Sequence, residues 1–177
     1  MTLVHPSMPA RTIKEFVEIA RKKPGELNFG NPGTGSSIDL SAQKLFQAAD
    51  IKLTNVGYKG QPQAALIELM TNLMHFEIVS LELALPHIRA GSVKPLAVMT
   101  DKRVADLPDV PTIAEAGFPE STYLPWYGIY VQAGKPDAIV AKINEAINKA
   151  LQTRKCSASS RSPTSQASRC RSPTSPR

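Results

Sequence analysis

Leu27-Asn28-Phe29-Gly30-Asn31-Pro32-Gly33-Thr34-Gly35-Ser36-Ser37 is the stretch that decides the fold. Its beginning reads as a short strand, and the glycines and proline that follow predict a tight turn. Over residues 37–49 apolar side chains recur at helical spacing, and we expect Leu40, Leu45 and Phe46 to face inward. A strand, a turn and a helix in this order are typical of an α/β fold.

The turn itself is the candidate binding site, and its residues are Gly33, Thr34, Gly35, Ser36 and Ser37. Glycines let the backbone approach a ligand closely and adopt positive φ angles. The unpaired N–H groups at the start of a helix, together with its positive dipole end, favour an anion. The hydroxyl groups add uncharged donors, so we predict reversible binding of a carboxylate without a buried counter-charge.

Two other interpretations of this turn stay open. Ser36 also fits a helix N-cap, with Asp39 three residues later completing a capping box. Residues 30–37 also approach the P-loop pattern, although Ser36 stands in the place of the lysine that contacts the phosphates. A nucleotide- or phosphate-binding protein with a degenerate P-loop is therefore the alternative function.

The rest of the body alternates between helical and strand-like segments, which extends the α/β prediction. A capping box at Thr12–Glu15 begins a helix that Pro24-Gly25 ends. Further elements are predicted as helices at 63–70, 82–90 and from 136, as strands at 52–58, 76–80, 93–100 and 126–132, and as a proline-bounded turn with one short helix at 108–117.

The C-terminal tail differs from the body in composition and charge. Six of the 21 basic residues and none of the 15 acidic residues lie from Arg154 onward, so residues 1–153 are electrically balanced. The tail is rich in Ser, Arg and Pro, and we expect 154–177 to be disordered. It contains both cysteines but no aromatic residue for base stacking, so no nucleic-acid partner is predicted. No metal site or cofactor is predicted either.

Seven phrases occur in an order that resembles the Bug/TctC family of extracytoplasmic solute-binding receptors of tripartite tricarboxylate transporters. They are His5-Pro6-Ser7, Lys23-Pro24-Gly25-Glu26-Leu27-Asn28-Phe29-Gly30, Gly33-Thr34-Gly35-Ser36-Ser37, Tyr58-Lys59-Gly60, Ala84-Leu85-Pro86-His87-Ile88-Arg89-Ala90-Gly91, Leu107-Pro108-Asp109-Val110-Pro111-Thr112-Ile113-Ala114-Glu115-Ala116-Gly117 and Trp126-Tyr127-Gly128.

The resemblance implies a two-lobed fold of the type II periplasmic binding proteins. We expect residues 1–7 to form the crossover strand at the hinge and residues 8–124 the second, ligand-binding lobe. Residues 125–153 would be a strand and a helix that return to the first lobe. Compared with the family, the chain is expected to be truncated at its N-terminus and to end in an aberrant tail, the product of a reading-frame change near residue 154.

The resemblance also implies a small carboxylate ligand, either a di- or tricarboxylate or an acidic amino acid, and membrane transporter subunits as partners. It implies a periplasmic location, whereas residues 1–20 show no signal peptide and the chain as written is expected in the cytoplasm.

Within the binding lobe, Tyr58 begins a loop after a strand, and we predict that its hydroxyl faces the ligand. Ser80 follows the next strand, where the family often has asparagine, and is predicted to take part in binding. Asp39 stands where the family often has histidine, and a carboxylate there would repel an anion or receive an amino group. No catalytic residue is predicted, because neither Ser36 nor Ser37 has the flanking glycines of a nucleophile elbow.

Overall fold

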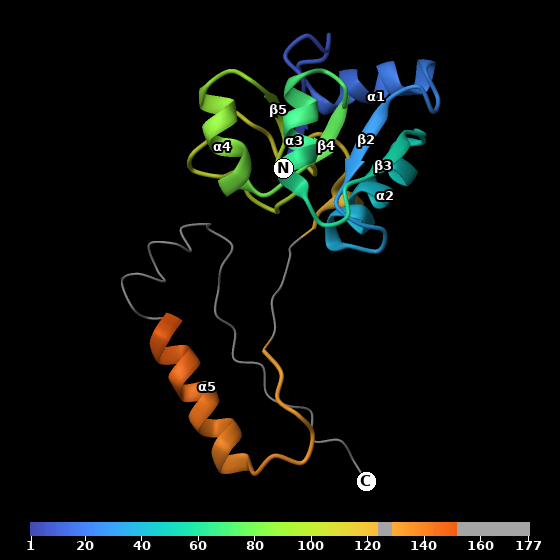
Figure 1. The fold of residues 1–177 in the computed structure, drawn as a ribbon. Helices are drawn as coiled ribbons and strands as arrows, with labels where there is room; N and C mark the ends of the chain where they lie inside the picture. Colours follow the sequence, from blue (N-terminus) through green and yellow to red (C-terminus); the bar gives the residue numbers. More distant parts are fainter. Residues whose placement is uncertain (124–128, 152–177) are drawn as a thin grey trace. The chain divides into compact units, whose positions relative to one another are not determined.

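The computed structural model describes residues 1–123 and 129–151. The chain divides into two compact units, Met1–Pro125 and Trp126–Arg177. The first unit holds a β-sheet with helices around it, and the described part of the second holds one long helix and the segment before it (Figure 1). Every residue of the candidate site belongs to the first unit.

A five-stranded sheet forms the centre of the first unit, in the order β3-β2-β4-β1-β5. Strand β2 pairs in parallel with β3 and β4, whereas β1 pairs antiparallel with β4 and β5. The strands are β1 (Thr2–Val4), β2 (Asn28–Asn31), β3 (Thr54–Gly57), β4 (Phe76–Ile78) and β5 (Lys94–Ala97). All strands except β1 therefore run in the same direction, and the predicted α/β class is confirmed.

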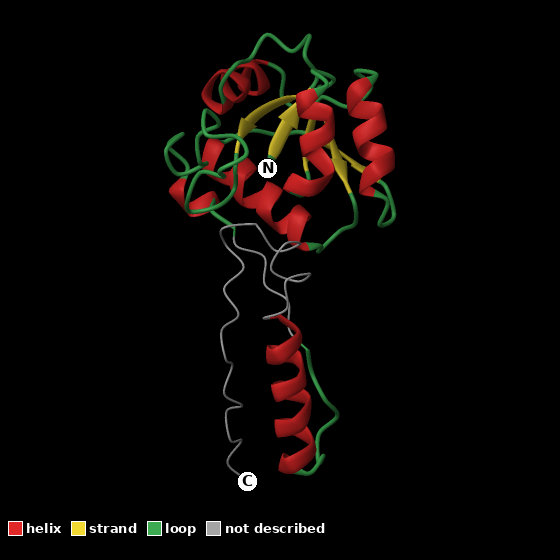
Figure 2. Cartoon of the chain, turned by 90° about the vertical axis from the view of Figure 1, so that its left-hand side faces the viewer, coloured by secondary structure: helices red, strands yellow, loops and turns green. Residues whose placement is uncertain are grey.

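Helices cover both faces of this sheet (Figure 2). The helices are α1 (Ile13–Lys22), α2 (Ser37–Ala49), α3 (Pro62–Met70), α4 (Leu81–Arg89), a 3-10 helix η1 (Pro119–Ser121) and, in the second unit, α5 (Asp137–Leu151). Helices α1 and α2 share one apolar cluster with Phe29 and Phe76, while α3 and α4 share a second cluster with Leu3. The two clusters lie on opposite faces because successive strand residues point to opposite sides.

Aromatic side chains hold the deciding strand, turn and helix together. Phe29 of β2 meets Phe46 of α2 edge to face, with ring centroids 5.3 Å apart. Phe16 of α1 stacks on Phe76 of β4 at 4.7 Å. Such pairs add to the large apolar area that each ring buries. Both ends of the turn between β2 and α2 are thus anchored in the core.

Helix α2 has the predicted bounds, but one of its side chains was assigned to the wrong face. Leu45 and Phe46 are buried as expected, whereas Leu40 is 55% exposed. Ala42 and Ala49 complete the buried stripe, and Leu40 lies on the opposite side of the helix.

Two other element predictions were wrong where the structure describes them. The short helix expected within 108–117 is a run of turns, and the only helical turn nearby is η1. Residues 129–132 are not in a strand, because no described strand pairs with them. Residues 126–128 of that predicted strand and the tail from 154 to 177 lie outside the described residues.

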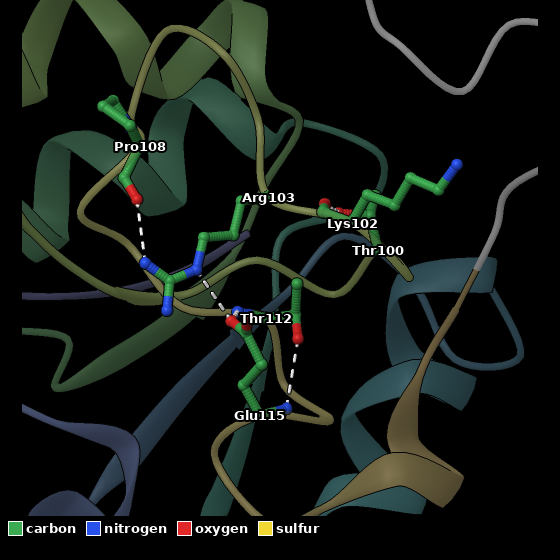
Figure 3. A network of polar contacts seen from close by, with 6 residues as sticks. All are labelled: Thr100, Lys102, Arg103, Pro108, Thr112 and Glu115. Carbon is green, nitrogen blue, oxygen red and sulfur yellow. Dashed lines mark hydrogen bonds and ion pairs between the residues drawn. The ribbon is translucent and has the colours of Figure 1, made fainter.

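The segment after β5 is held by a compact polar network (Figure 3). Glu115 accepts a hydrogen bond from the Thr112 N–H (2.8 Å), and the Thr112 hydroxyl accepts one from the Glu115 N–H (3.1 Å). Arg103 donates from Nε to Glu115 (2.9 Å) and from a terminal nitrogen to the Pro108 carbonyl (3.0 Å). These hydrogen bonds connect Arg103 to the proline-rich loop at residues 107–117, and we refer to Arg103, Pro108, Thr112 and Glu115 together as the clamp.

Candidate ligand-binding site

The predicted site residues gather at one edge of the sheet. Because β2, β3 and β4 are parallel, the loops that follow them begin at the same edge. The loops after β2 and β3 also contact each other directly. The Tyr58 N–H donates to the Asn31 carbonyl at 2.8 Å, and the Gly60 N–H donates to the Pro32 carbonyl. The turn with Gly33–Ser37 and the loop of Tyr58 thus form one continuous rim.

The chain reverses its direction of winding between β2 and β4. These two strands are neighbours, but β2 leads through α2 to β3 on one side, and β4 leads through α4 to β5 on the other. Helices α2 and α4 consequently lie on opposite faces of the sheet. In open α/β sheets such a switch point opens a crevice at the carboxyl ends of the strands, where ligands bind. The topology alone therefore predicts that residues 32–37 and 79–80, which follow β2 and β4, lie at the ligand-binding crevice.

The two glycines of the turn shape it but do not offer their N–H groups to a ligand. The Gly33 N–H donates to the Asn31 side-chain oxygen at 2.8 Å, and the Gly35 N–H donates to Asp39 at 2.8 Å. Gly35 has a φ of +76°, in the left-handed region where glycine is favoured. Glycine is therefore needed at position 35 for its backbone conformation. The two glycines shape the turn, and their N–H groups are not available to a ligand.

The donors that remain open lie at three neighbouring positions. Within the described residues, the N–H groups of Thr34, Ser37 and Ile38 have no protein acceptor. Ser36 is the N-cap, and its hydroxyl oxygen accepts from the Asp39 N–H at 3.2 Å, which leaves the hydroxyl proton free to donate. The N-cap is therefore confirmed, and it coexists with open donors at the first two helical positions. The predicted capping box was wrong, because the Ser36 N–H donates to the Gly33 carbonyl (3.1 Å) and Asp39 accepts from the Gly35 N–H instead. Sequence reasoning missed Ile38, although the second helical residue always carries such an N–H.

Tyr58 lies on the rim, but its hydroxyl is already engaged. The hydroxyl donates to the Glu68 carboxylate on α3 at 2.5 Å. Burial, and then the bond to Glu68, raise the pKa of Tyr58 above its usual value. The ring lies against Gly30, where an added Cβ would be 3.6 Å from Tyr58 and 3.0 Å from the Ala65 methyl group. Tyr58 can thus form the wall of a site through its ring, while its proton points to α3.

Ser80 lies on the other side of the switch point. It is the N-cap of α4 and is exposed, and its side chain makes no capping bond. The adjacent Val79 N–H is used by the sheet, since it donates to the Met1 carbonyl at 3.0 Å. Within the described residues the Ser80 hydroxyl makes no capping bond, and its part in ligand binding stays a prediction.

A buried carboxyl group that the sequence reading overlooked lies beside this rim. Glu77 of β4 is 1% exposed, and its Oε2 atom has no hydrogen-bond partner. Its Cγ atom is 3.6 Å from the Cβ position at Gly30, the same position that Tyr58 approaches. Burial raises the pKa of Glu77 to about 8. A single acid between the apolar Phe76 and Ile78 was the available signal.

The described residues limit what else the site can hold. In residues 1–123 and 129–151, no cluster of three or more His, Asp, Glu or Cys side chains could hold a metal ion. None of the helices in these ranges combines the length and apolar character needed to cross a membrane. What the rim offers is a set of uncharged hydrogen-bond donors.

A mixed α/β sheet with helices on both faces and open donors at a switch point is the fold expected of a periplasmic solute-binding protein. The comparison with known families agrees. Residues 1–160 match the model of the tripartite tricarboxylate transporter family receptor, and the chain belongs to this family. The match covers every residue predicted for the site.

Solved structures of the periplasmic binding class share the fold. The structure of R. palustris Rpa4515 with adipate superposes with a TM-score of 0.80 at 31% identity, over 91% of this chain and 54% of that one. MatC (Rpa3494) from Rhodopseudomonas palustris with bound malate gives 0.79 at 29% identity, over 89% and 53%. The periplasmic binding protein BugD gives 0.80 at 26% identity, over 90% and 53%.

The chain is short compared with its relatives. It spans 42%, 46% and 46% of the length of three curated relatives that it matches. The activity, ligands and partners of a whole protein of this family are therefore matters of proposal for this chain.

Proposed function

We propose that this chain forms one wall of a cleft that captures a small dicarboxylate for a tripartite tricarboxylate-type transporter. The open N–H groups of Thr34, Ser37 and Ile38 are the observation that carries the proposal. They lie at the start of a 13-residue helix, whose dipole favours a negative group at this end. The hydroxyls of Thr34, Ser36 and Ser37 supply further donors.

The chemistry of this rim suits binding and release. Neutral donors can surround a carboxylate group without a buried cation, so the empty site has no uncompensated charge to desolvate. Ser80 and the Tyr58 ring, across the switch point and along the rim, complete the proposed contacts. Two structural neighbours were solved with adipate and with malate, which supports a dicarboxylate as the ligand.

The remaining parts of the function concern a whole protein of this family. We propose that a second lobe, corresponding to the half of the relatives that this chain does not span, supplies the other wall of the cleft. The periplasm is the proposed place of action, and membrane subunits of the transporter are the proposed recipients of the ligand. No catalytic step is proposed, since in the described residues no histidine is hydrogen bonded to Ser36 or Ser37.

Isothermal calorimetry and thermal unfolding of the full chain test this function. The panel contains adipate, malate, inorganic phosphate and ATP at the same ionic strength. We expect the two dicarboxylates to bind and to raise the Tm, and phosphate and ATP to do neither. Stabilisation by ATP with no response to either dicarboxylate would favour the degenerate P-loop at residues 30–37 instead.

A further inference from the structure

Asp39 is buried directly beneath the candidate binding turn. Its side chain is part of α2, and the residue is only 6% exposed. The carboxylate accepts hydrogen bonds from the Gly35 N–H (2.8 Å), the Asn31 side-chain nitrogen (2.9 Å) and the Gln43 side-chain nitrogen (3.3 Å). Its charge is therefore distributed over three neutral donors, and it faces the inner side of the turn.

Asn31 continues this arrangement from the end of β2. The residue is 1% exposed, and its amide is used on both sides. Its nitrogen donates to Asp39 at 2.9 Å, and its oxygen accepts from the Gly33 N–H at 2.8 Å. Asn31 and Asp39 thus bind each other and fix both glycines of the turn, one each.

We propose that Asn31 and Asp39 are positioning residues that hold the turn so that the N–H groups of Thr34, Ser37 and Ile38 point away from the protein toward the ligand. The inference rests on the proposed function, because it concerns the same site. The pair satisfies the N–H groups of Gly33 and Gly35, and the Ser36 N–H donates to the Gly33 carbonyl (3.1 Å), so the N–H groups of Thr34, Ser37 and Ile38 are the open ones. The N–H donors are already arranged before a ligand arrives, so binding does not have to order the turn.

An experiment can distinguish whether Asp39 acts by positioning the turn or by its negative charge. A carboxylate behind an anion site repels the anion, and this repulsion alone would make removal of Asp39 improve binding. The proposed positioning makes the opposite prediction. In Asp39→Asn, the single amide oxygen is expected to replace the carboxylate oxygen that accepts from both Asn31 and Gln43, so the bond from the Gly35 N–H is lost.

The reciprocal exchange N31D/D39N should restore the arrangement. An aspartate at position 31 accepts from the Gly33 N–H with one oxygen and from the new amide nitrogen at position 39 with the other. The amide oxygen at position 39 then accepts from the Gly35 N–H. The number of charges in the pair is unchanged, and all bonds to the two glycines have a donor and an acceptor.

The experiment compares the full-length wild-type chain with D39N, N31D/D39N and D50N. Asp50 is the C-cap of the same helix, so D50N is a matched control that removes the same charge from the far end. Calorimetry measures affinity for succinate, and amide hydrogen exchange measures protection of Gly33 and Gly35. We expect D39N to bind succinate about tenfold more weakly, as for a lost hydrogen bond to a charged group, and to lose the protection of Gly35. D50N should match the wild type, and N31D/D39N should regain both properties.

Each outcome decides between the two levels of the account. If the wild type ignores succinate, adipate and malate while Gly35 protection is lost in D39N and regained in N31D/D39N, the proposed ligand class is wrong and the positioning pair stands. If D39N retains Gly35 protection, or binds succinate as well as or better than the wild type, the positioning role is overturned. A uniform loss of Tm without a selective change at Gly33 and Gly35 would likewise overturn it.

Discussion

The turn that begins α2 and the turn at Thr112 follow the same sequence rule but reach different ends. Each starts with a hydroxyl residue followed three positions later by an acid, and in each the hydroxyl accepts from the N–H of that acid. Glu115 reaches back to the N–H of Thr112 and pairs with Arg103, which closes the turn (Figure 3). Asp39 instead reaches beneath its own turn to Gly35 and leaves the helix start open.

The difference shows that the same capping pattern can either use its backbone donors within the protein or leave them open to a ligand. The longer glutamate side chain can fold back to the cap, and an arginine neutralises it there. The shorter aspartate is drawn to Asn31, and the glycine at position 35 brings an N–H within its reach. What surrounds the acid, more than the pattern itself, decides whether backbone donors remain available to a ligand.

Glu77 extends this comparison to an acid for which the described residues supply no hydrogen-bond donor at Oε2, and it should give the largest effect. Its folded-state pKa of about 8 is above the usual 4.5, so the folded protein holds a proton that the unfolded chain releases. Stability is therefore fully present below about pH 4.5 and is lost as the pH rises through about 8. The shift corresponds to roughly 5 kcal/mol at most.

Urea denaturation at pH 5 and pH 9 measures this loss. We expect the free energy of unfolding of Glu77→Gln, relative to that of the wild type, to be higher at pH 9 than at pH 5. The buried Met1 amino group, whose pKa burial lowers to about 5, changes stability in the opposite direction in both proteins and cancels in this comparison. Glu120→Gln, at an exposed glutamate of η1, is the control and should keep the wild-type dependence. The same change in stability between pH 5 and pH 9 in Glu77→Gln as in the wild type would show that Glu77 is not buried as described.

Removal of the two capping hydroxyls should separate the open turn from the closed one. Ser36→Ala and Thr112→Ala each delete an acceptor for the N–H three residues later. We expect each to lower the free energy of unfolding by about 1 kcal/mol. Only Ser36→Ala should also weaken the binding of a dicarboxylate, because Thr112 belongs to the clamp.

Chemical denaturation and calorimetry on the same two variants give this comparison. A loss of affinity in Thr112→Ala equal to that in Ser36→Ala would mean that the clamp contributes to the ligand site.

The smallest expected effect concerns the acid of the closed turn. The Thr112 N–H, followed by Arg103, lowers the pKa of Glu115 below its usual value. The stabilisation it provides is thus present above the usual pKa and is lost as the pH falls through the lowered one. Because Glu115 is exposed and screened by solvent, we expect Glu115→Gln to change the Tm only slightly at pH 7. Thermal unfolding from pH 7 to pH 3 should show a smaller acid-side decrease in this variant than in the wild type.

Much of this arrangement could be predicted from local sequence. Apolar spacing located α2, and glycine and serine chemistry located the turn before it. The partners of the polar side chains could not be predicted, because they depend on how neighbouring elements fold against one another. Tyr58 meets Glu68 in the second turn of the next helix, and Asp39 meets Asn31 across the turn. Glu77 is buried beside Gly30 of the neighbouring strand, a contact between residues far apart in the sequence.

The most direct test of the account is a titration of the ¹⁵N-labelled full chain with adipate, followed by the amide resonances of the turn. We predict saturable shifts for Thr34, Ser37 and Ile38, with much smaller shifts for Gly33 and Gly35, whose N–H groups already bind Asn31 and Asp39. Shifts confined to the loop at 100–117, or no shift at the start of α2 at saturating adipate, would contradict it.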